Sequence, residues 1–214
     1  MDIKDKNVLV LGGGKSGIAA CNLLADCGAK VTLYDGNDRL KEEDFKDKLR
    51  HADKITFAFG EMKEEVYKGA DFSVISPGIS IEAEFLDGIK ALNIPIWSEV
   101  ELAFKLGKGR LVAITGTNGK TTTTTLVGEI MKAYYDSVFV VGNIGTPYTE
   151  CVCDMRDDTV TVAEISSFQL ETIIDFQPEV SAVLNVTPDH LNRHHTMEIY
   201  RDTKKAVTVN QTSD

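Results

Sequence analysis

Two glycine-rich loops, each lying between a short apolar run and a helix-length stretch, constrain the fold of this chain more than any other feature. The first loop covers residues 12–17 (GGGKSG) and the second covers residues 115–121 (TGTNGKT). A strand that leads through glycines into a helix is typical of βαβ units, whose strands lie parallel in one sheet. The two loops therefore predict an α/β fold built from two parallel-sheet units in series.

The alternation of apolar runs and amphipathic stretches continues along both halves of the chain. We expect strands at residues 7–11, 30–34, 55–59, 72–76, 94–97, 111–114, 137–141, 160–165 and 180–186. Helices are expected directly after the first loop, at residues 98–106 and at residues 120–135, and the charge pattern of residues 38–50 is also helical.

The chain has 214 residues, enough for one large domain or two small ones at roughly 150 residues per domain. A Gly-Lys-Gly stretch at residues 107–109 is followed by a fresh strand, so we place the domain boundary there. The interpretation is a Rossmann-like domain at residues 1–106 and a P-loop ATPase-like domain at residues 110–214.

Composition and charge exclude several classes of function. Lys and Arg number 23 against 33 Asp and Glu, and the net charge of -10 disfavours nonspecific binding to nucleic acid or to anionic lipid. No apolar run approaches the ~18 residues of a membrane span, and the charged residues 1–7 do not resemble a signal peptide. Cys151 and Cys153 form a possible metal or redox pair, but no second Cys/His pair stands at zinc spacing, so we interpret the cysteines as reduced. We expect a cytoplasmic protein with no membrane or nucleic-acid partner.

The first loop has the spacing of a nucleotide-binding fingerprint. Gly12, Gly14 and Gly17 fit G-x-G-x-x-G, in which glycines allow a tight turn and let a phosphate approach the helix N-terminus. Asp35 ends the next predicted strand, where a carboxylate that binds ribose is expected. The pattern indicates a nucleotide or dinucleotide site, with NAD as one ligand. The alternative is that the glycines serve only the turn between strand and helix.

The second loop resembles a phosphate-binding P-loop, although Ile114 occupies the position of the first glycine in the full pattern. In such a loop the backbone N–H groups cradle phosphates, Lys120 reaches their outer oxygens and the Thr121 hydroxyl binds Mg²⁺. The predicted ATP-binding residues are Gly116, Thr117, Asn118, Gly119, Lys120, Thr121 and Thr122.

Two polar groups near the ends of later strands extend this site. Glu164 lies near the end of the strand at residues 160–165, where a Mg²⁺ ligand belongs beside a P-loop; the alternative is an edge or capping glutamate. His190 closes the segment NVTPDH, and taken alone an ordinary capping or packed histidine is the simpler interpretation. His194 and His195 are interpreted as exposed loop residues.

Together these motifs resemble the muramyl ligases, ATP-dependent amide ligases of peptidoglycan precursor synthesis. The loop TGTNGKTT at residues 115–122 is shared with that family and with folylpolyglutamate synthases, which do not fit a glycine-rich nucleotide domain before it. The match to the members that add D-glutamate rests on SPG at residues 76–78, GNIG at 142–145, SSFQLE at 166–171 and NVTPDH at 185–190. The resemblance spans essentially the whole chain.

The resemblance implies that the first domain holds the uridine diphosphate of UDP-N-acetylmuramoyl-L-alanine instead of NAD. The substrate-binding residues it implies in that domain are Lys15, Ser16, Asp35, Gly36, Asn37, Ser76, Pro77 and Gly78. Nearer the reaction centre they are Asn143, Ser166, Gln169 and His190. The family often has Thr-Arg after the strand-end aspartate, whereas Gly36 and Asn37 follow here.

The resemblance also implies a reaction and its catalytic groups. ATP would phosphorylate the substrate carboxylate to an acyl phosphate, and the amine of D-glutamate would then displace phosphate. Because two anions meet in the first step, cations carry much of the catalysis. The implied catalytic residues are Lys120, His190 and Lys204. Thr121 and Glu164 would hold one Mg²⁺, and His190 with a carbamylated Lys204 would hold a second.

The position of the modified lysine rests on the resemblance alone. The adjacent Lys205 leaves the register of the modified lysine uncertain by one, and without the family both lysines would be interpreted as solvated helix residues.

The muramyl ligases also have a C-terminal domain and further central-domain sequence, so we interpret this chain as a truncated, inactive portion of a monomeric ligase. Its incomplete sheet would leave apolar surface exposed, which predicts self-association. The alternatives from other classes are an NAD-binding oxidoreductase or sensor and a nonenzymatic nucleotide-binding module.

Overall fold

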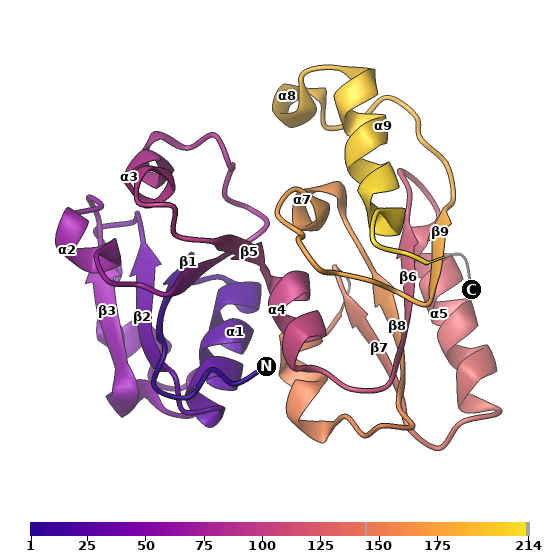
Figure 1. Ribbon diagram of the computed structural model, residues 1–214, viewed down its shortest axis with the longest axis horizontal. Helices are drawn as coiled ribbons and strands as arrows, with labels where there is room; N and C mark the ends of the chain where they lie inside the picture. Colours follow the sequence, from indigo (N-terminus) through magenta and orange to yellow (C-terminus); the bar gives the residue numbers. More distant parts are fainter. Residues whose placement is uncertain (144, 213–214) are drawn as a thin grey trace. The chain divides into compact units, whose positions relative to one another are not determined.

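A computed structural model describes residues 1–143 and 145–212 of the chain. Ile144 of the GNIG segment therefore lies outside the described residues. Internal contacts divide the chain into two compact units, Met1–Leu102 and Ala103–Asp214. Each unit contains its own parallel sheet (Figure 1), which confirms the predicted α/β class.

The first unit contains a five-stranded sheet in the order β3-β2-β1-β4-β5, with all neighbouring strands parallel. Its strands are β1 (Asn7–Leu11), β2 (Lys30–Asp35), β3 (Ile55–Phe59), β4 (Phe72–Ile75) and β5 (Ile96–Ser98). From β1 the chain first adds β2 and β3 on one side of the sheet and then adds β4 and β5 on the other side. Such a switch point places the loops after β1 and β4 side by side at the carboxyl ends of the strands, where α/β sheets bind ligands.

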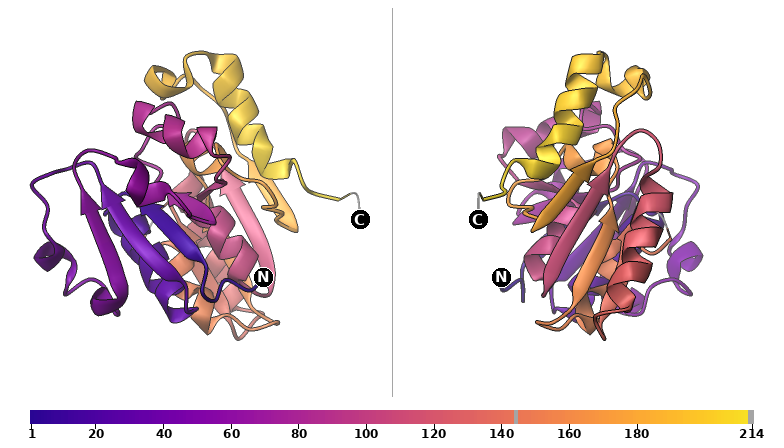
Figure 2. Two further views of the ribbon diagram at one scale, coloured as in Figure 1. Left: turned by 60° about the vertical axis from the view of Figure 1, so that its left-hand side comes forward. Right: turned by 90° about the vertical axis from the view of Figure 1, so that its right-hand side faces the viewer.

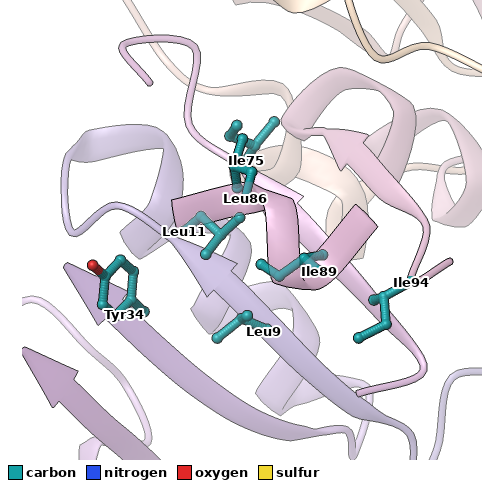
Figure 3. Close-up of a cluster of buried hydrophobic side chains, with 7 residues drawn as sticks. All are labelled: Leu9, Leu11, Tyr34, Ile75, Leu86, Ile89 and Ile94. Atoms are coloured by element: carbon teal, nitrogen blue, oxygen red, sulfur yellow. The ribbon is translucent and has the colours of Figure 1, made fainter. Parts of the chain in front are cut away.

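Helix α1 (Lys15–Asp26) packs against β1, β2 and β4 through the apolar side chains that its helical spacing predicts. A second set of apolar side chains joins the strands to α3 (Asp87–Ala91) (Figure 3). Its members are Leu9, Leu11, Tyr34, Ile75, Leu86, Ile89 and Ile94. Each fully buried Leu or Ile contributes about 1.5–3 kcal/mol relative to an exposed one, so this cluster holds the strand ends that carry the loops.

The second unit contains a four-stranded parallel sheet in the order β7-β8-β6-β9. Its strands are β6 (Arg110–Thr115), β7 (Val138–Gly142), β8 (Val160–Glu164) and β9 (Val180–Val183). Helix α5 (Lys120–Lys132) packs against β6, β7 and β8, and α6 (Tyr148–Cys151) packs against β7. The helices α7 (Ser167–Leu170), α8 (Leu191–His194) and α9 (Met197–Lys205) lie together beyond the carboxyl end of β8 (Figures 1 and 2).

The segment at residues 38–50 does not form the predicted helix. It contains only a 3-10 turn at Glu42–Phe45, because Phe45 and Leu49 are its only buried side chains and a helix packs through a continuous apolar stripe. Phe45 instead lies against Phe57 and Phe59 of β3. The predicted strands occur within three residues of their expected bounds.

Two further α-helices, α2 and α4, complete those of the described residues. The helix α2 (Glu64–Tyr67) was not predicted, and α4 (Glu99–Leu106) agrees with the charged helix expected at residues 98–106. Within the described residues, no helix has both the length and the apolar character needed to cross a membrane.

Candidate functional site

A pocket of about 510 Å³ opens at the carboxyl end of the first sheet, between the loops that follow β1 and β4. Seven of the eight residues predicted there as substrate contacts line it: Lys15, Ser16, Asp35, Gly36, Ser76, Pro77 and Gly78. The eighth, Asn37, lies next to the pocket and donates its backbone N–H to Asp35 Oδ1 at 3.0 Å. The topology thus brings together residues from three separate segments of sequence.

Close backbone approach explains why a glycine stands at position 17 of the first loop. A Cβ atom at Gly17 would lie 1.9 Å from the carbonyl oxygen of Gly12, so α1 can start against the loop only without a side chain there. At Gly14 no atom lies within 4 Å of an added Cβ. The space beside Gly14, at the N-terminus of α1, is where the sequence predicts that a phosphate binds.

The carboxylate of Asp35 holds the glycine loop in place. Its Oδ2 accepts a hydrogen bond from the backbone N–H of Gly13 at 2.8 Å, while Oδ1 accepts the bond from Asn37. The carboxylate therefore ties the loop after β1 to the loop after β2. The sequence predicted a ligand contact for Asp35. The structure shows that Asp35 also holds the two loops together, which supports the shape of the pocket.

The second glycine loop joins β6 to α5 and carries the residues predicted to bind ATP phosphates. Gly116 and Gly119 have φ angles of +153° and +81°, which favour glycine, and Gly119 begins α5 as its N-cap. Lys120 Nζ donates a hydrogen bond to the Thr117 carbonyl oxygen at 3.0 Å, so its ammonium group lies along the loop. Thr122, in the first turn of α5, is exposed.

The segment after β9 supports this loop from the other side. The backbone N–H of Asn118 donates to Asn185 Oδ1 at 2.9 Å, and Asn185 Nδ2 donates back to the Asn118 carbonyl oxygen at 3.0 Å. Thr117 Oγ1 lies 3.2 Å from the hydroxyl oxygen of Tyr200 on α9. These contacts tie the NVTPDH segment and α9 to the loop.

Glu164 stands at the centre of the second site. Its side chain is buried at the carboxyl end of β8, where Oε2 accepts from the Thr121 hydroxyl at 2.8 Å and Oε1 accepts from Asn143 Nδ2 at 2.9 Å. Because β8 lies between β7 and β6, Glu164 is not on an edge strand. The N-cap of the following helix is Ser166, so the capping alternative also does not hold.

The same oxygens fit one Mg²⁺ ion. Neighbouring ligands of an octahedral Mg²⁺ at about 2.1 Å lie about 3 Å apart, and the Thr121 and Glu164 oxygens are 2.8 Å apart. Across the residues described, no group of three or more His, Cys, Asp and Glu side chains is placed to hold a metal ion. An ion here would therefore take its remaining ligands from phosphate and water.

Lys204 and Lys205 differ sharply in environment. Lys204 is 2% exposed and its Nζ donates to the Gly116 carbonyl oxygen at 2.9 Å, whereas Lys205 is exposed. Burial lowers the pKa of Lys204 to about 8, with a further lowering from the positive charge of Lys120. The structure thus brings Lys204, and not its neighbour, to the phosphate loop.

His190 lies on the segment that follows β9, with a left-handed backbone at φ +53°. Its ring centroid is 4.9 Å from that of Phe168, and half of its side chain is exposed. Ser166 and Gln169 form a capping box at the start of α7, in which Gln169 Oε1 accepts from the Ser166 backbone N–H at 2.9 Å. Both side chains thereby begin the helix that carries Phe168.

His194 is buried, so its prediction as an exposed loop residue is wrong. Its Nε2 lies 2.9 Å from Ser167 Oγ, and burial lowers its pKa, with smaller effects from Arg193 and other cations. Arg193 forms two hydrogen bonds with Glu171. The error arose because α8 packs against α7 through tertiary contacts. Ser167 and Glu171, spaced i and i+4, were the only local signal of a shared face.

Comparison with known proteins assigns both units. The family model described as "Mur ligase MurD-like, N-terminal domain" matches residues 6–98, and the model "Mur ligase middle domain" matches residues 114–214. The UDP-N-acetylmuramoylalanine--D-glutamate ligases of Lachnoclostridium phytofermentans and Lachnospira eligens are 54% and 52% identical to this chain. These alignments cover 100% and 99% of the chain but 47% of each relative. The chain thus spans about half the length of the curated relatives it matches.

A solved structure shares the fold at low sequence identity. It is the UDP-N-acetylmuramate:L-alanyl-gamma-D-glutamyl-meso-diaminopimelate ligase from Neisseria meningitides, with a TM-score of 0.61 and 16% identity. The match covers 98% of this chain and 69% of that chain. At this identity the likeness supports the arrangement of strands and helices only.

Proposed function

The chain belongs to the Mur ligase family, and from this premise we propose that it is part of an ATP-dependent ligase of peptidoglycan precursor synthesis. The proposed reaction joins the amine of D-glutamate to the L-alanine carboxylate of UDP-N-acetylmuramoyl-L-alanine. Because the chain spans about half the length of its relatives, the activity is proposed for the longer protein. We propose that this protein acts in the cytoplasm as a monomer.

The observation that carries the proposal is the contact between Thr121 and Glu164 beside Lys120 at the second glycine loop. The loop amides would bind the ATP phosphates, and the Lys120 ammonium would lie against their negative charge. Thr121 and Glu164 would hold Mg²⁺, which when bound would neutralise charge on the reacting phosphate. Asn143 fixes the Glu164 carboxylate by its hydrogen bond to Oε1.

We propose that Lys204 is the carbamylated residue. Only the neutral amine reacts with CO₂, forming an N–C bond and releasing one proton. A pKa of about 8 leaves about a tenth of Lys204 neutral at pH 7, more than a hundredfold above a lysine with the ordinary pKa of 10.5. The exposed Lys205 has no such environment. The carbamate would supply oxygen ligands to a second Mg²⁺ together with His190.

The first unit is proposed to bind the uridine diphosphate group. Its pocket joins the N-terminus of α1, the turn at residues 76–78 and the loop after β2. Backbone N–H groups at a helix N-terminus favour a diphosphate, which a chain of net charge -10 must bind through such local groups. Lys15 would supply the cation at this place.

Calorimetric titration of this chain with UDP-N-acetylmuramoyl-L-alanine and, separately, with NAD tests the first site. Saturable binding of the uridine nucleotide without binding of NAD is expected. Binding of NAD alone would overturn the proposal and favour a dinucleotide-binding protein. Competition by UDP would show that the diphosphate end of the substrate is the part held.

Phosphate release by the full-length protein, with and without D-glutamate, tests the reaction. We expect phosphate release that depends on both UDP-N-acetylmuramoyl-L-alanine and D-glutamate. Glu164→Gln should reduce that release by roughly 10²–10³-fold, the size of effect seen when an electrostatic catalytic contact is lost. Glu129→Gln is the matched control, because Glu129 is an exposed glutamate on α5. Phosphate release that does not depend on D-glutamate would rule out D-glutamate as the acceptor.

A further inference from the structure

Four polar side chains outside the proposed reaction form a buried cluster between α7 and α8. We call Ser167, Glu171, Arg193 and His194 the α7–α8 cluster. His194 Nε2 lies 2.9 Å from Ser167 Oγ, and its Nδ1 lies 3.7 Å from Glu171 Oε1. Arg193 Nε donates to Glu171 Oε1 at 3.1 Å, and its Nη2 donates to Oε2. The charged pair is almost fully buried, so removing either member would leave the other charge buried without this partner.

The cluster surrounds Phe168, and Phe168 is also the side chain that His190 contacts. The Arg193 guanidinium lies 4.3 Å from the centre of the Phe168 ring, and the His194 ring stacks on it at 5.5 Å. The His190 ring packs on the same phenyl group at 4.9 Å. Two histidines four residues apart therefore share one aromatic neighbour.

The backbone connects the same residues a second time. The N–H of His194 donates to the His190 carbonyl oxygen at 3.0 Å, which closes the single turn of α8. His190 itself has a left-handed backbone and a half-exposed ring. Its ring centroid also lies 6.3 Å from that of Tyr200, and its Nε2 lies 3.5 Å from Asp189 Oδ2. The direction of the ring therefore depends on these neighbours and on what holds Phe168 and α8 in place.

We propose that His194 is a positioning residue, which with Ser167 and the Glu171–Arg193 pair fixes the His190 imidazole against Phe168. The inference rests on the proposed function in one respect only: that the fixed imidazole acts at the substrate or a metal. Through β8, the cluster also connects His190 to Glu164, because α7 follows that strand directly. Buried contacts, instead of an exposed loop, then set the distance between His190 and Glu164, the two predicted Mg²⁺ ligands.

Three variants separate hydrogen bonding from packing. His194→Phe keeps an aromatic ring beside Phe168 and Tyr200 but removes the nitrogen that meets Ser167. His194→Gln places an amide near the position of Nε2 and should restore that hydrogen bond in part. The neighbouring exposed residue supplies the matched control, His195→Asn, because asparagine tolerates its positive φ of +62°.

The direct readout is the proton NMR spectrum of the His190 ring in this chain, because the tilted Phe168 ring 4.9 Å away shifts the resonances of the His190 ring protons. We expect the shift to collapse in His194→Phe, to return in part in His194→Gln and to persist in His195→Asn. Native His190 shifts in a folded His194→Phe variant would overturn the inference. If that variant does not fold, Ser167→Ala removes only the hydroxyl partner and must weaken the His190 shift for the inference to stand.

The second readout is kinetic and uses the full-length protein. Loss of a side chain that orients a ligand costs about 10–100-fold in activity or metal affinity. We expect His194→Phe to lower kcat by that factor while KM for the uridine substrate changes less than about twofold. An unchanged kcat, or a fall matched by simple unfolding, would overturn the positioning role. An inactive native protein would instead overturn the proposed function, and the NMR result would then decide the positioning of His190 alone.

Discussion

Lys204 and Lys205 are chemically identical neighbours whose environments differ because one helical residue step turns a side chain by about 100°. Lys204 points into the unit and meets the Gly116 carbonyl oxygen, while Lys205 faces water. Burial is also the main cause of the lowered pKa of Lys204. The same contrast separates the buried His194 from the exposed His195.

The pKa of Lys204 predicts a specific dependence of stability on pH. Burial lowers that pKa from 10.5 to about 8. Below pH 8 the folded and unfolded chains both carry the proton, and folding bears the full cost of burying the charge. Between pH 8 and 10.5 the folded chain releases the proton while the unfolded chain keeps it, so stability rises with pH in that window.

The comparison is with Lys204→Met, which has no charge to bury. The difference in free energy of unfolding between the native chain and this variant should change by about 3 kcal/mol between pH 7.5 and 10.5, since one pKa unit corresponds to about 1.4 kcal/mol. Urea unfolding without bicarbonate or divalent metal measures it. Lys205→Met should follow the native curve, and parallel curves for native and Lys204→Met would contradict the prediction.

Gly17 predicts a second effect at the scale of one residue. Gly17→Ala places a Cβ 1.9 Å from the Gly12 carbonyl oxygen, a backbone atom that cannot move without shifting the loop. We expect a loss of about 3 kcal/mol, at the upper end of the usual cost of overpacking. Gly14→Ala is the control: its backbone has φ −74° and its Cβ meets open space, so stability should change by less than about 1 kcal/mol. Similar losses in both variants, measured by urea unfolding, would count against this argument.

At the scale of elements, short helices carry the second site and depend on their caps. The four-residue helix α7 starts with the Ser166–Gln169 capping box, and α9 starts at Thr196, whose Oγ1 accepts from the Ile199 N–H at 3.2 Å. Short helices are marginal by themselves, so side-chain caps and tertiary packing determine whether they form. The buried Tyr200 and Lys204 provide that packing for α9.

Removing the α9 cap should loosen the element that carries Lys204. Thr196→Ala should destabilise the chain by about 0.5–2 kcal/mol, because the Ile199 N–H then loses its partner. Thr196→Ser keeps the hydroxyl and should behave like the native chain. Hydrogen exchange should locate the loss of protection in α9, and loss spread evenly through the unit would show that Thr196 acts otherwise.

At the scale of the molecule, the second unit exposes apolar side chains on a helix and on an edge strand. Leu126 and Ile130 occupy one face of α5 at i and i+4, with exposures of 60% and 47%, and Tyr134 continues the spacing at 80%. The edge strand β9 also presents Val180 and Val183. Exposed apolar side chains and an edge strand both favour association.

The expected result is self-association of this chain at high concentration. Sedimentation velocity should show a sedimentation coefficient that rises with protein concentration, and Leu126→Lys with Tyr134→Lys should suppress the rise. Because both side chains are exposed, each substitution should change the free energy of unfolding by less than about 0.5 kcal/mol. A native chain that stays monomeric throughout would refute the prediction.

The amino-acid sequence by itself determined the features that depend on local geometry. Alternating apolar runs predicted the strands, and glycines with positive φ or no room for a side chain marked both loops. Loop chemistry then pointed to Lys120, Thr121 and Glu164, whose contacts the structure provides. The resemblance to the muramyl ligases is confirmed by the family models.

Only the tertiary structure decided which side chains of the later segments are buried. The order of strands, which no local pattern encodes, sets Glu164 between β6 and β7 and brings α9 over the second loop. Residues 38–50 have the charge pattern of a helix, yet their packing supports only a turn around Phe45. His194 was predicted to be a loop residue, but the contact of α8 with α7 buries it. Local sequence fixes periodicity and turn geometry, whereas burial depends on segments far apart in the chain, because desolvation is a property of the whole packed unit.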